Sequence, residues 1–225
     1  MNLSKNHINK EGGKILAEVL GKNGTLEALD LSGNLLGVSG TKALAGALKT
    51  NTKLKYLSLY SNIVDVDGAR ALKETLIVND SLQFLDVGSN RLRDKGIMEI
   101  AEGILGNKTC ALKGIGLRFN FITEDGADQF FSKVLGKSKI ENIYIRNNEL
   151  SEPFLIKLDE KLKESKMKAY LDVLEKVQYL DQEWIDRSIW ISPLWVGADP
   201  KQIKEFFQHT KECGLITSVR IKQGK

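Results

Sequence analysis

The sequence is poor in the residues that catalysis and metal binding use most. Among 225 residues it has only two cysteines and two histidines. Cys110 and Cys213 lie far apart and form no CxxC pair, so neither a disulfide framework nor a cysteine metal site is indicated. His7 and His209 lack paired-ligand spacing and have no nucleophile motif nearby. The sequence therefore predicts a protein that is not an enzyme and holds no metal or cofactor.

Long apolar runs are also absent. No stretch is apolar for long enough to span a membrane, and no signal peptide precedes the first regular segment. The glycines of Gly12-Gly13-Lys14 lack the earlier glycine and the following Ser/Thr of a phosphate loop. We expect a cytoplasmic or nuclear protein that contacts no membrane and takes no small-molecule substrate.

What the sequence does contain is a repeat. An asparagine recurs every 28 residues, with one interval of 30, and apolar residues recur in step with it, as Leu29 and Leu31 do before Asn34. Ten and fourteen positions after each asparagine come further apolar residues, such as Leu44 and Leu48. The apolar period thus changes from two to about 3.6, which predicts strand, turn, helix and turn in each unit. The asparagines are Asn6, Asn34, Asn62, Asn90, Asn120 and Asn148.

The recurring asparagines are predicted to form a structural ladder. Each stands where a strand turns away, and its amide can donate to and accept from backbone groups that would otherwise be buried without partners. Replacing one with alanine should cost about 1–3 kcal/mol, which is a mechanical role. Six residues after the asparagine, five units carry a glycine, which we expect to let helix and strand backbones approach closely. These glycines are Gly12, Gly40, Gly68, Gly96 and Gly126.

Residues 26–34 (LEALDLSGN) and 40–48 (GTKALAGAL) resemble the ribonuclease-inhibitor-like subfamily of leucine-rich repeats. The resemblance covers residues 1–165 as about six units of 28–30 residues. It implies an α/β fold, a right-handed horseshoe solenoid with a parallel concave sheet and convex helices. The family includes inhibitors, GTPase activators, receptor sensor regions and scaffolds, so the resemblance implies the fold more sharply than the function.

The strand residues between the inward leucines are predicted to form an exposed concave face that binds a protein ligand. Aromatic and arginine side chains are enriched at binding hot spots. Asp30 and Asp86 lie toward the amino end while Arg118 and Arg146 lie toward the carboxyl end, so we expect a graded potential. Alternatively, strand propensity alone favours Tyr and Phe at half-exposed positions. The predicted face consists of Asp30, Tyr56, Ser58, Tyr60, Phe84, Asp86, Arg118, Phe119, Tyr144 and Arg146.

Residues 166–186 are predicted to form a closing strand and a connecting helix. Leu171 and Val173 follow Ile143 and Ile145 by 28 residues, which predicts a seventh strand in register with the others. The alternative is one long helix over residues 165–186.

Residues 187–225 are predicted to form a small β-α-β segment. Residues 189–194, 203–207 and 217–221 resemble the first half of an RNA-recognition motif, with residues 189–194 as the RNP2 strand. The resemblance implies binding of single-stranded RNA, with Trp190 stacking on a base and Arg220 and Lys222 near the phosphates. The segment carries seven Lys/Arg and three acids, an excess of four that equals the net charge of the chain. The alternative for Trp190 is packing against the connecting helix or against the second half of an RNA-recognition domain.

The sequence thus predicts a non-catalytic protein-interaction scaffold that uses its concave face. RNA binding through residues 187–225 would make the protein an adaptor. The alternative, which the family resemblance implies, is a GTPase-activating or regulatory repeat protein with no RNA role.

Overall fold

The computed structural model describes residues 1–164 and 168–170. Within these residues helices and strands alternate along the chain, as the repeats predict. The helices are α1 (Lys10–Lys22), α2 (Gly37–Leu48), α3 (Val66–Leu76), α4 (Arg93–Gly106), α5 (Glu124–Val134) and α6 (Glu152–Glu164). The strands are β1 (Ala28–Asp30), β2 (Tyr56–Ser58), β3 (Phe84–Asp86), β4 (Gly114–Gly116), β5 (Asn142–Tyr144) and β6 (Lys168–Tyr170).

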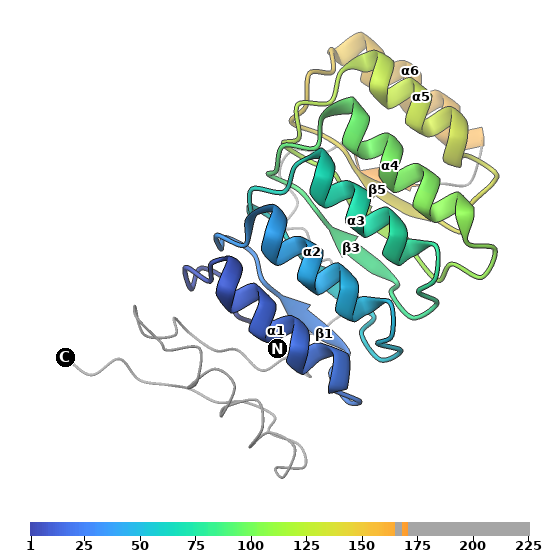
Figure 1. The fold of residues 1–225 in the computed structure, drawn as a ribbon. Coiled ribbons are helices and arrows are strands. Elements are labelled where there is room, and N and C mark those ends of the chain that lie inside the picture. The colour runs from blue at the N-terminus through green and yellow to red at the C-terminus, as the bar shows by residue number, and fades with distance from the viewer. Residues whose placement is uncertain (165–167, 171–225) are drawn as a thin grey trace.

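The six strands form one parallel sheet in chain order. The register advances by one repeat at a time, so that Leu29 pairs with Leu57 and Leu57 with Leu85. Because a helix connects each strand to the next, the chain winds as a right-handed solenoid. Figure 1 shows the helices side by side on one face, with the sheet behind them. The predicted α/β solenoid is confirmed, while the predicted β-α-β segment at 187–225 lies outside the described residues.

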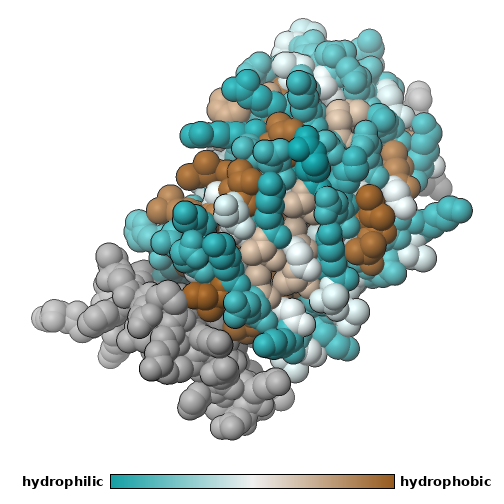
Figure 2. Space-filling view, viewed as in Figure 1, coloured by the Kyte–Doolittle hydropathy of each residue, from teal (hydrophilic) through white to brown (hydrophobic). Residues whose placement is uncertain are grey.

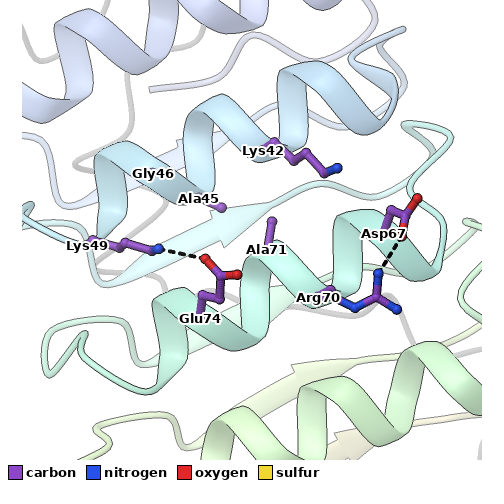
Figure 3. A pocket seen from close by; sticks show the side chains of 8 residues that line it. All are labelled: Lys42, Ala45, Gly46, Lys49, Asp67, Arg70, Ala71 and Glu74. Carbon is purple, nitrogen blue, oxygen red and sulfur yellow. Dashed lines mark hydrogen bonds and ion pairs between the residues drawn. The ribbon is translucent and has the colours of Figure 1, made fainter.

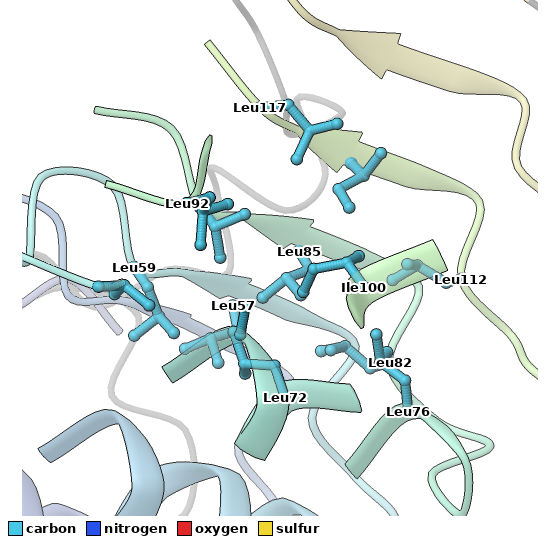
Figure 4. Packing of buried hydrophobic residues seen from close by; sticks show 14 of the residues in the cluster. Leu57, Leu59, Leu72, Leu76, Leu82, Leu85, Leu92, Ile100, Leu112 and Leu117 are labelled. Carbon is cyan, nitrogen blue, oxygen red and sulfur yellow. The ribbon is translucent and has the colours of Figure 1, made fainter. Parts of the chain in front are cut away.

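The core lies between the sheet and the helices. Strand residues such as Leu57 and Leu85, and helix residues such as Leu72 and Ile100, are at most 1% exposed (Figure 4). The period-two and period-3.6 apolar positions of each repeat therefore meet in one layer. Full burial of each such side chain stabilises the fold by about 1.5–3 kcal/mol, and stacked repeats make this layer continuous.

The asparagines tie each repeat to its neighbour. Oδ1 of Asn90 accepts hydrogen bonds from the backbone nitrogens of Asn62, at 3.0 Å, and Val64, at 2.8 Å. Its Nδ2 donates to the carbonyls of Leu59, at 2.9 Å, and Val87, at 3.0 Å. A donation to the carbonyl of the preceding repeat recurs at Asn34, Asn62, Asn120 and Asn148.

A second asparagine ladder, which the sequence analysis missed, lies at the other end of the helices. Nδ2 of Asn79 donates to the carbonyls of Leu48, at 2.7 Å, and Asn51, at 3.0 Å, while its Oδ1 accepts from the backbone nitrogen of Leu82 at 2.8 Å. Asn51 and Asn107 donate to the preceding repeat in the same way. The sequence feature that could have predicted this ladder is the 28-residue spacing of Asn23, Asn51, Asn79 and Asn107.

The helices begin in two ways. α1, α3 and α5 have side-chain caps from Asn9, Asp65 and Thr123, which accept from backbone nitrogens of the first turn. α2 and α4 have no such cap, and their first residues, Gly37 and Arg93, are in the left-handed conformation. The backbone nitrogens of Gly37 and Arg93 donate instead to the main-chain carbonyls of Asn62 and Asn120, the ladder asparagines of the next repeats.

The recurrent glycines make room for a different contact from the one predicted. A Cβ atom on Gly68 would lie 2.6 Å from Cγ1 of Val64, and one on Gly96 would lie 2.9 Å from Cβ of Leu92. Val64 and Leu92 each precede the glycine by four residues. Ala69, on the preceding helix, would lie 3.6 Å from the added atom at Gly96. The glycines accommodate the helix entry and the neighbouring helix, so the predicted approach of helix to strand is wrong.

The predicted closing strand is present at Lys168–Tyr170, but its register is wrong. Ile143 pairs with Ala169, a separation of 26 residues, where the sequence analysis expected 28 and a pairing with Leu171. The last repeat is thus two residues shorter than the pattern. A single long helix over 165–186 is also excluded, because residues 168–170 form a strand.

Candidate functional site on the concave face

Two columns of residues cross the concave face, one from the first and one from the third position of each strand. The central strand residues point into the core, so their neighbours on both sides face the opposite surface. The first column contains Ala28, Tyr56, Phe84, Gly114 and Asn142, and the second contains Asp30, Ser58, Asp86, Gly116 and Tyr144. The structure therefore brings six of the predicted binding residues together on adjacent strands.

β4 interrupts both columns with glycine. A Cβ atom on Gly114 would overlap the ring of Phe84, and one on Gly116 would overlap the carboxylate of Asp86. The side chains of β3 therefore lie over the backbone of β4, in space that any larger residue would occupy. The sequence analysis missed this feature, although the Gly-Ile-Gly strand itself was the signal, with glycine at both concave positions of one strand.

An aromatic row crosses the face at this point. The rings of Tyr56 and Phe84 are stacked, with centroids 5.4 Å apart and planes at 13°. Phe84 meets Tyr144 edge to face across the glycines of β4, with centroids 6.0 Å apart. Cζ of Arg118 lies 5.2 Å from the ring centroid of Tyr144, in cation–π geometry. Each such contact contributes about 0.5–1.5 kcal/mol, so the row is held in a defined arrangement.

Asp86 lies beside the aromatic row and is 2% exposed. Its Oδ1 accepts a hydrogen bond from the backbone nitrogen of Gly88 at 2.8 Å. Burial raises the pKa of Asp86 to about 6, and the charge of Asp30 also raises it, while the Gly88 hydrogen bond and the charge of Arg118 lower it. At neutral pH the face therefore holds a carboxylate charge that burial opposes, which is common at functional sites.

A hydrogen-bonded group occupies the amino end of the face. Oδ1 of Asp30 accepts from the backbone nitrogen of Ser32 at 2.8 Å and from its hydroxyl at 2.5 Å. The Ser32 hydroxyl also lies 2.7 Å from that of Ser58. Ser58 Oγ accepts in turn from the backbone nitrogen of Tyr60 at 3.3 Å. Ser32 was not among the predicted site residues, yet it links two that were.

The exposure of the face differs from the prediction. Tyr56, Ser58, Asp86 and Tyr144 were expected to be exposed, but their exposed fractions are 7%, 1%, 2% and 8%. Ring stacking and the close approach to β4 contribute to this burial. The ring of Tyr60 likewise lies over Gly88, where a Cβ atom would be 2.8 Å from its Cδ2. The residues that remain half-buried are Asp30, Tyr60, Phe84, Arg118 and Arg146.

The carboxyl end of the face carries the two arginines. Nη2 of Arg146 lies 3.3 Å from Oε1 of Glu152, whereas its Nε is buried and has no hydrogen-bond partner among the residues that the structure describes. Phe119, like Arg118, follows the last residue of β4. It lies in the loop after β4 and is 46% exposed. The structure thus places Asp30 and Asp86 on β1 and β3, and the arginines beyond β4 and β5.

The convex face has a hollow of about 270 Å³ between α2 and α3 (Figure 3). Four of its charged side chains form two ion pairs. Nζ of Lys49 lies 2.8 Å from Oε2 of Glu74, and Nη1 of Arg70 lies 2.7 Å from Oδ1 of Asp67. Because these ion pairs engage four of the five charged side chains that line the hollow, all but Lys42, the hollow is a weaker candidate than the concave face.

The remaining predicted features fall elsewhere. Trp190, Arg220 and Lys222 lie outside the described residues. Gly12 and Gly13 lie inside α1, and Cys110 is buried in the core, where burial raises the pKa of its thiol. Among residues 1–164 and 168–170, no cluster of three or more His, Cys, Asp or Glu could hold a metal ion. No helix in that part of the chain is long and apolar enough to span a membrane.

Comparisons with known proteins bear on the architecture. A family profile described as "Leucine Rich repeat" matches residues 22–45 and 78–101. Among solved structures, the chain is similar to the actin-binding site 2 of leiomodin-1, with 16% identity and a TM-score of 0.54, covering 68% of this chain and 92% of that one. It is also similar to the tropomodulin C-terminal domain of Caenorhabditis elegans, with 15% identity and a TM-score of 0.56, covering 69% and 92%. The fold is a leucine-rich-repeat solenoid.

These leucine-rich-repeat similarities concern the fold alone at such low identity. No curated protein matched the sequence. Nothing in the matches assigns the chain to the ribonuclease-inhibitor-like subfamily, so that resemblance stays a prediction.

Proposed function

We propose that this protein is a non-catalytic interaction scaffold that binds a protein ligand through its concave face. The observation that carries the proposal is the aromatic row of Tyr56, Phe84 and Tyr144, which ends at Arg118 and in which Phe84 lies over Gly114 of β4. Aromatic and arginine side chains held in fixed positions are the usual anchors of a protein interface. The repeat fold commonly supplies such a surface, since stacked strands form an extended concave sheet.

Two features of the face favour a ligand with its own charges and hydrogen-bond groups. The buried Nε of Arg146 is a donor that needs an acceptor, which a ligand carbonyl or carboxylate can supply. The acids lie toward one end and the arginines toward the other. A partner with the opposite polarity would therefore be bound in one orientation.

A double substitution tests the proposal. Tyr60→Ala with Arg118→Ala removes a half-buried ring and the charge at the end of the row without touching the apolar core. Affinity capture from extracts of the source cells, quantified by mass spectrometry, should lose specific proteins with this variant. A Lys53→Ala and Gln83→Ala control, which changes exposed residues, should keep them. Identical capture by wild type and double variant would refute the concave site, provided that both variants unfold at the same denaturant concentration.

Actin is a defined probe for the same surface, because leiomodin-1, a fold neighbour, is described by its actin-binding site. Co-sedimentation with filaments and binding to monomeric actin should be compared for wild type and the double variant. Actin binding that is weaker in the double variant would identify actin as a ligand of the concave face. Binding that it leaves intact would place actin on another surface.

RNA binding through residues 187–225 remains a second candidate, which the excess of four positive charges in that segment favours. Titration of a fluorescent mixed-sequence single-stranded RNA into the full chain tests it. Salt-dependent binding that Trp190→Ala weakens would support the adaptor. Absence of binding at low salt would leave a protein scaffold alone.

A further inference from the structure

A second surface of the molecule carries exposed apolar side chains that the concave site does not use. Leu35, Ile63, Phe119 and Phe121 lie in the loops that lead from the strands to the helices, and are 50%, 44%, 46% and 55% exposed. We call these four residues the apolar rim. Figure 2 shows hydrophobic residues gathered along the left edge of the molecule, where Figure 1 has the loops that enter α2 and α3.

The loops of the apolar rim are neighbours in space. The backbone nitrogen of Gly37 donates to the carbonyl of Asn62 at 3.0 Å, and that of Arg93 donates to the carbonyl of Asn120 at 2.9 Å. The nitrogen of Arg91 donates to the carbonyl of Val64 at 2.8 Å. Successive loops are thus hydrogen-bonded from the repeat of Leu35 to that of Phe121. The four apolar side chains therefore lie along one edge of the solenoid, in a stripe that the loop of Arg91 divides between Ile63 and Phe119.

The backbone conformation of the apolar rim disfavours large side chains and so lowers the stability of the fold. Ile63, Phe119 and Phe121 have φ of 61°, 53° and 57°, in the left-handed region that bulky and β-branched residues rarely adopt. The residue that corresponds to Phe119 in an earlier repeat is Gly33, with φ of 66°. Glycine or asparagine would suit these positions better for stability. Large apolar residues are thus kept where both the backbone and exposure to water disfavour them.

The apolar stripe is interrupted by positive charge. In the repeat of Asn90 the corresponding loop carries two exposed arginines, Arg91 and Arg93. Arg93 also has a left-handed backbone, with φ of 55°, where α2 begins with Gly37. Within the part of the chain that the structure describes, neither arginine forms a salt bridge, although nine other ion pairs are present there. Their charges are available to an acidic partner.

We propose that the apolar rim and its two arginines bind an amphipathic, acidic helix of another protein. The apolar side of that helix packs on Leu35, Ile63, Phe119 and Phe121, and its carboxylates face Arg91 and Arg93. The stripe spans three repeat intervals, roughly 15–30 Å at the spacing of packed strands or helices. A helix of about 10–20 residues covers that length at 1.5 Å per residue. This proposal does not depend on the concave site.

Selection from a phage-displayed library of 16-residue helical peptides against the full chain tests the proposal. Counter-selection uses the Phe119→Asn, Phe121→Asn variant, whose substitutions suit the left-handed backbone. Enriched peptides should have an apolar stripe at i, i+3, i+4 and i+7, together with net negative charge. In fluorescence polarisation their affinity should fall at least about tenfold in the double variant, a loss of about 1.4 kcal/mol. Arg91→Gln with Arg93→Gln should weaken binding and reduce its salt dependence.

Three results would overturn the proposal. In the first, the selected peptides bind the Phe119→Asn, Phe121→Asn variant as tightly as wild type. In the second, the selected peptides are basic or lack an apolar stripe. Self-association in light scattering that the double variant abolishes would show that a second copy of this chain occupies the apolar rim. A Tyr60→Ala, Arg118→Ala protein that still binds the peptides would separate this surface from the concave one and agree with the proposal.

Discussion

The carboxylate of Asp86 lies over the backbone of Gly116, in space that the Cβ atom of any other residue would occupy. Asp86 belongs to β3 and Gly116 to the paired position of β4. The missing side chain on one strand thus decides where a buried charge on the next strand can lie. This relationship also explains how Phe84 can reach Tyr144 across β4, since Gly114 leaves the same kind of space.

Gly116→Ala should destabilise the protein by about 1–3 kcal/mol, because the added methyl group overlaps the Asp86 carboxylate and must displace it. Urea unfolding gives the change in free energy. Combining Gly116→Ala with Asp86→Ala should recover much of the loss, since the two side chains compete for one space. Additive effects of the two substitutions would contradict the proposed contact.

Gly46→Ala is a matched control for Gly116→Ala, because it should change the free energy of unfolding in the opposite direction. Gly46 is exposed within α2, and an added Cβ atom would meet nothing within 4 Å. This substitution should stabilise the protein by about 0.5–1 kcal/mol through helix propensity alone. A destabilising Gly46→Ala would show that alanine substitutions report something other than local space.

Asp86 should make stability depend on pH in a direction opposite to most carboxylates. Its pKa rises from 3.8 to about 6 on folding, so the folded protein binds this proton more tightly. The resulting stabilisation is fully present below about pH 4 and is lost as the pH rises through about 6, an effect of about 2–3 kcal/mol. Other carboxylates, such as Glu102 beside Lys73, have lowered pKa values and respond in the opposite direction.

Comparison with Asp86→Asn isolates the effect of Asp86. Asparagine keeps the acceptor for the Gly88 nitrogen but carries no charge. The variant should be more stable than wild type at pH 7.5, and this advantage should shrink by about 2–3 kcal/mol at pH 4. An advantage that is equal at both pH values would show that Asp86 titrates normally and is not held against burial.

Asn90→Ala should cost more than about 2 kcal/mol, because it leaves buried backbone nitrogens of Asn62 and Val64 and carbonyls of Leu59 and Val87 without partners. Gln83→Ala, an exposed change in the same repeat, is the control and should alter the unfolding free energy by less than about 0.5 kcal/mol. Equal effects of the two substitutions would show that the ladder does not stabilise the solenoid.

Phe121→Asn should raise the free energy of unfolding by about 0.5–1 kcal/mol, because asparagine tolerates the left-handed backbone and the ring is 55% exposed. Phe121→Leu keeps the unfavourable backbone and should bring no such gain. Thermal and urea unfolding measure both variants. A Phe121→Asn protein that is less stable than wild type would show that the ring packs for stability rather than for binding.

The repeat pattern predicted the solenoid well because the residue spacing within each unit specifies the strand, turn and helix of that unit. The position of Asn34 after Leu29 and Leu31, and of Leu44 after Asn34, defines strand, turn and helix locally. The closing strand was placed two residues late, because its pairing of Ala169 with Ile143 breaks the 28-residue spacing that the prediction assumed.

The candidate site was harder to predict, because its geometry depends on contacts between repeats. Alternation placed Phe84 and Asp86 on the concave face correctly. The positions of their side chains depend on the absence of side chains at Gly114 and Gly116 of the neighbouring strand, and a search of the sequence for binding side chains does not consider glycines. Phe119 was predicted on the concave face from its position beside Arg118, and its backbone is left-handed, with φ of 53°. The same left-handed backbone recurs one residue before each ladder asparagine, at Lys5, Gly33, Ser61, Ser89, Phe119 and Asn147, so it belongs to the repeat and not to the side chain.

Site-specific photo-crosslinking tests the central claim most directly. A benzophenone amino acid would replace Tyr60 on the concave face or, as the control, Lys42 on the convex face, and irradiation would follow in extracts of the source cells. We predict a defined crosslinked protein from position 60 that is absent from position 42 and lost when Arg118→Ala is added. Crosslinks from position 42 alone, or identical products from both positions, would contradict protein binding by the concave face.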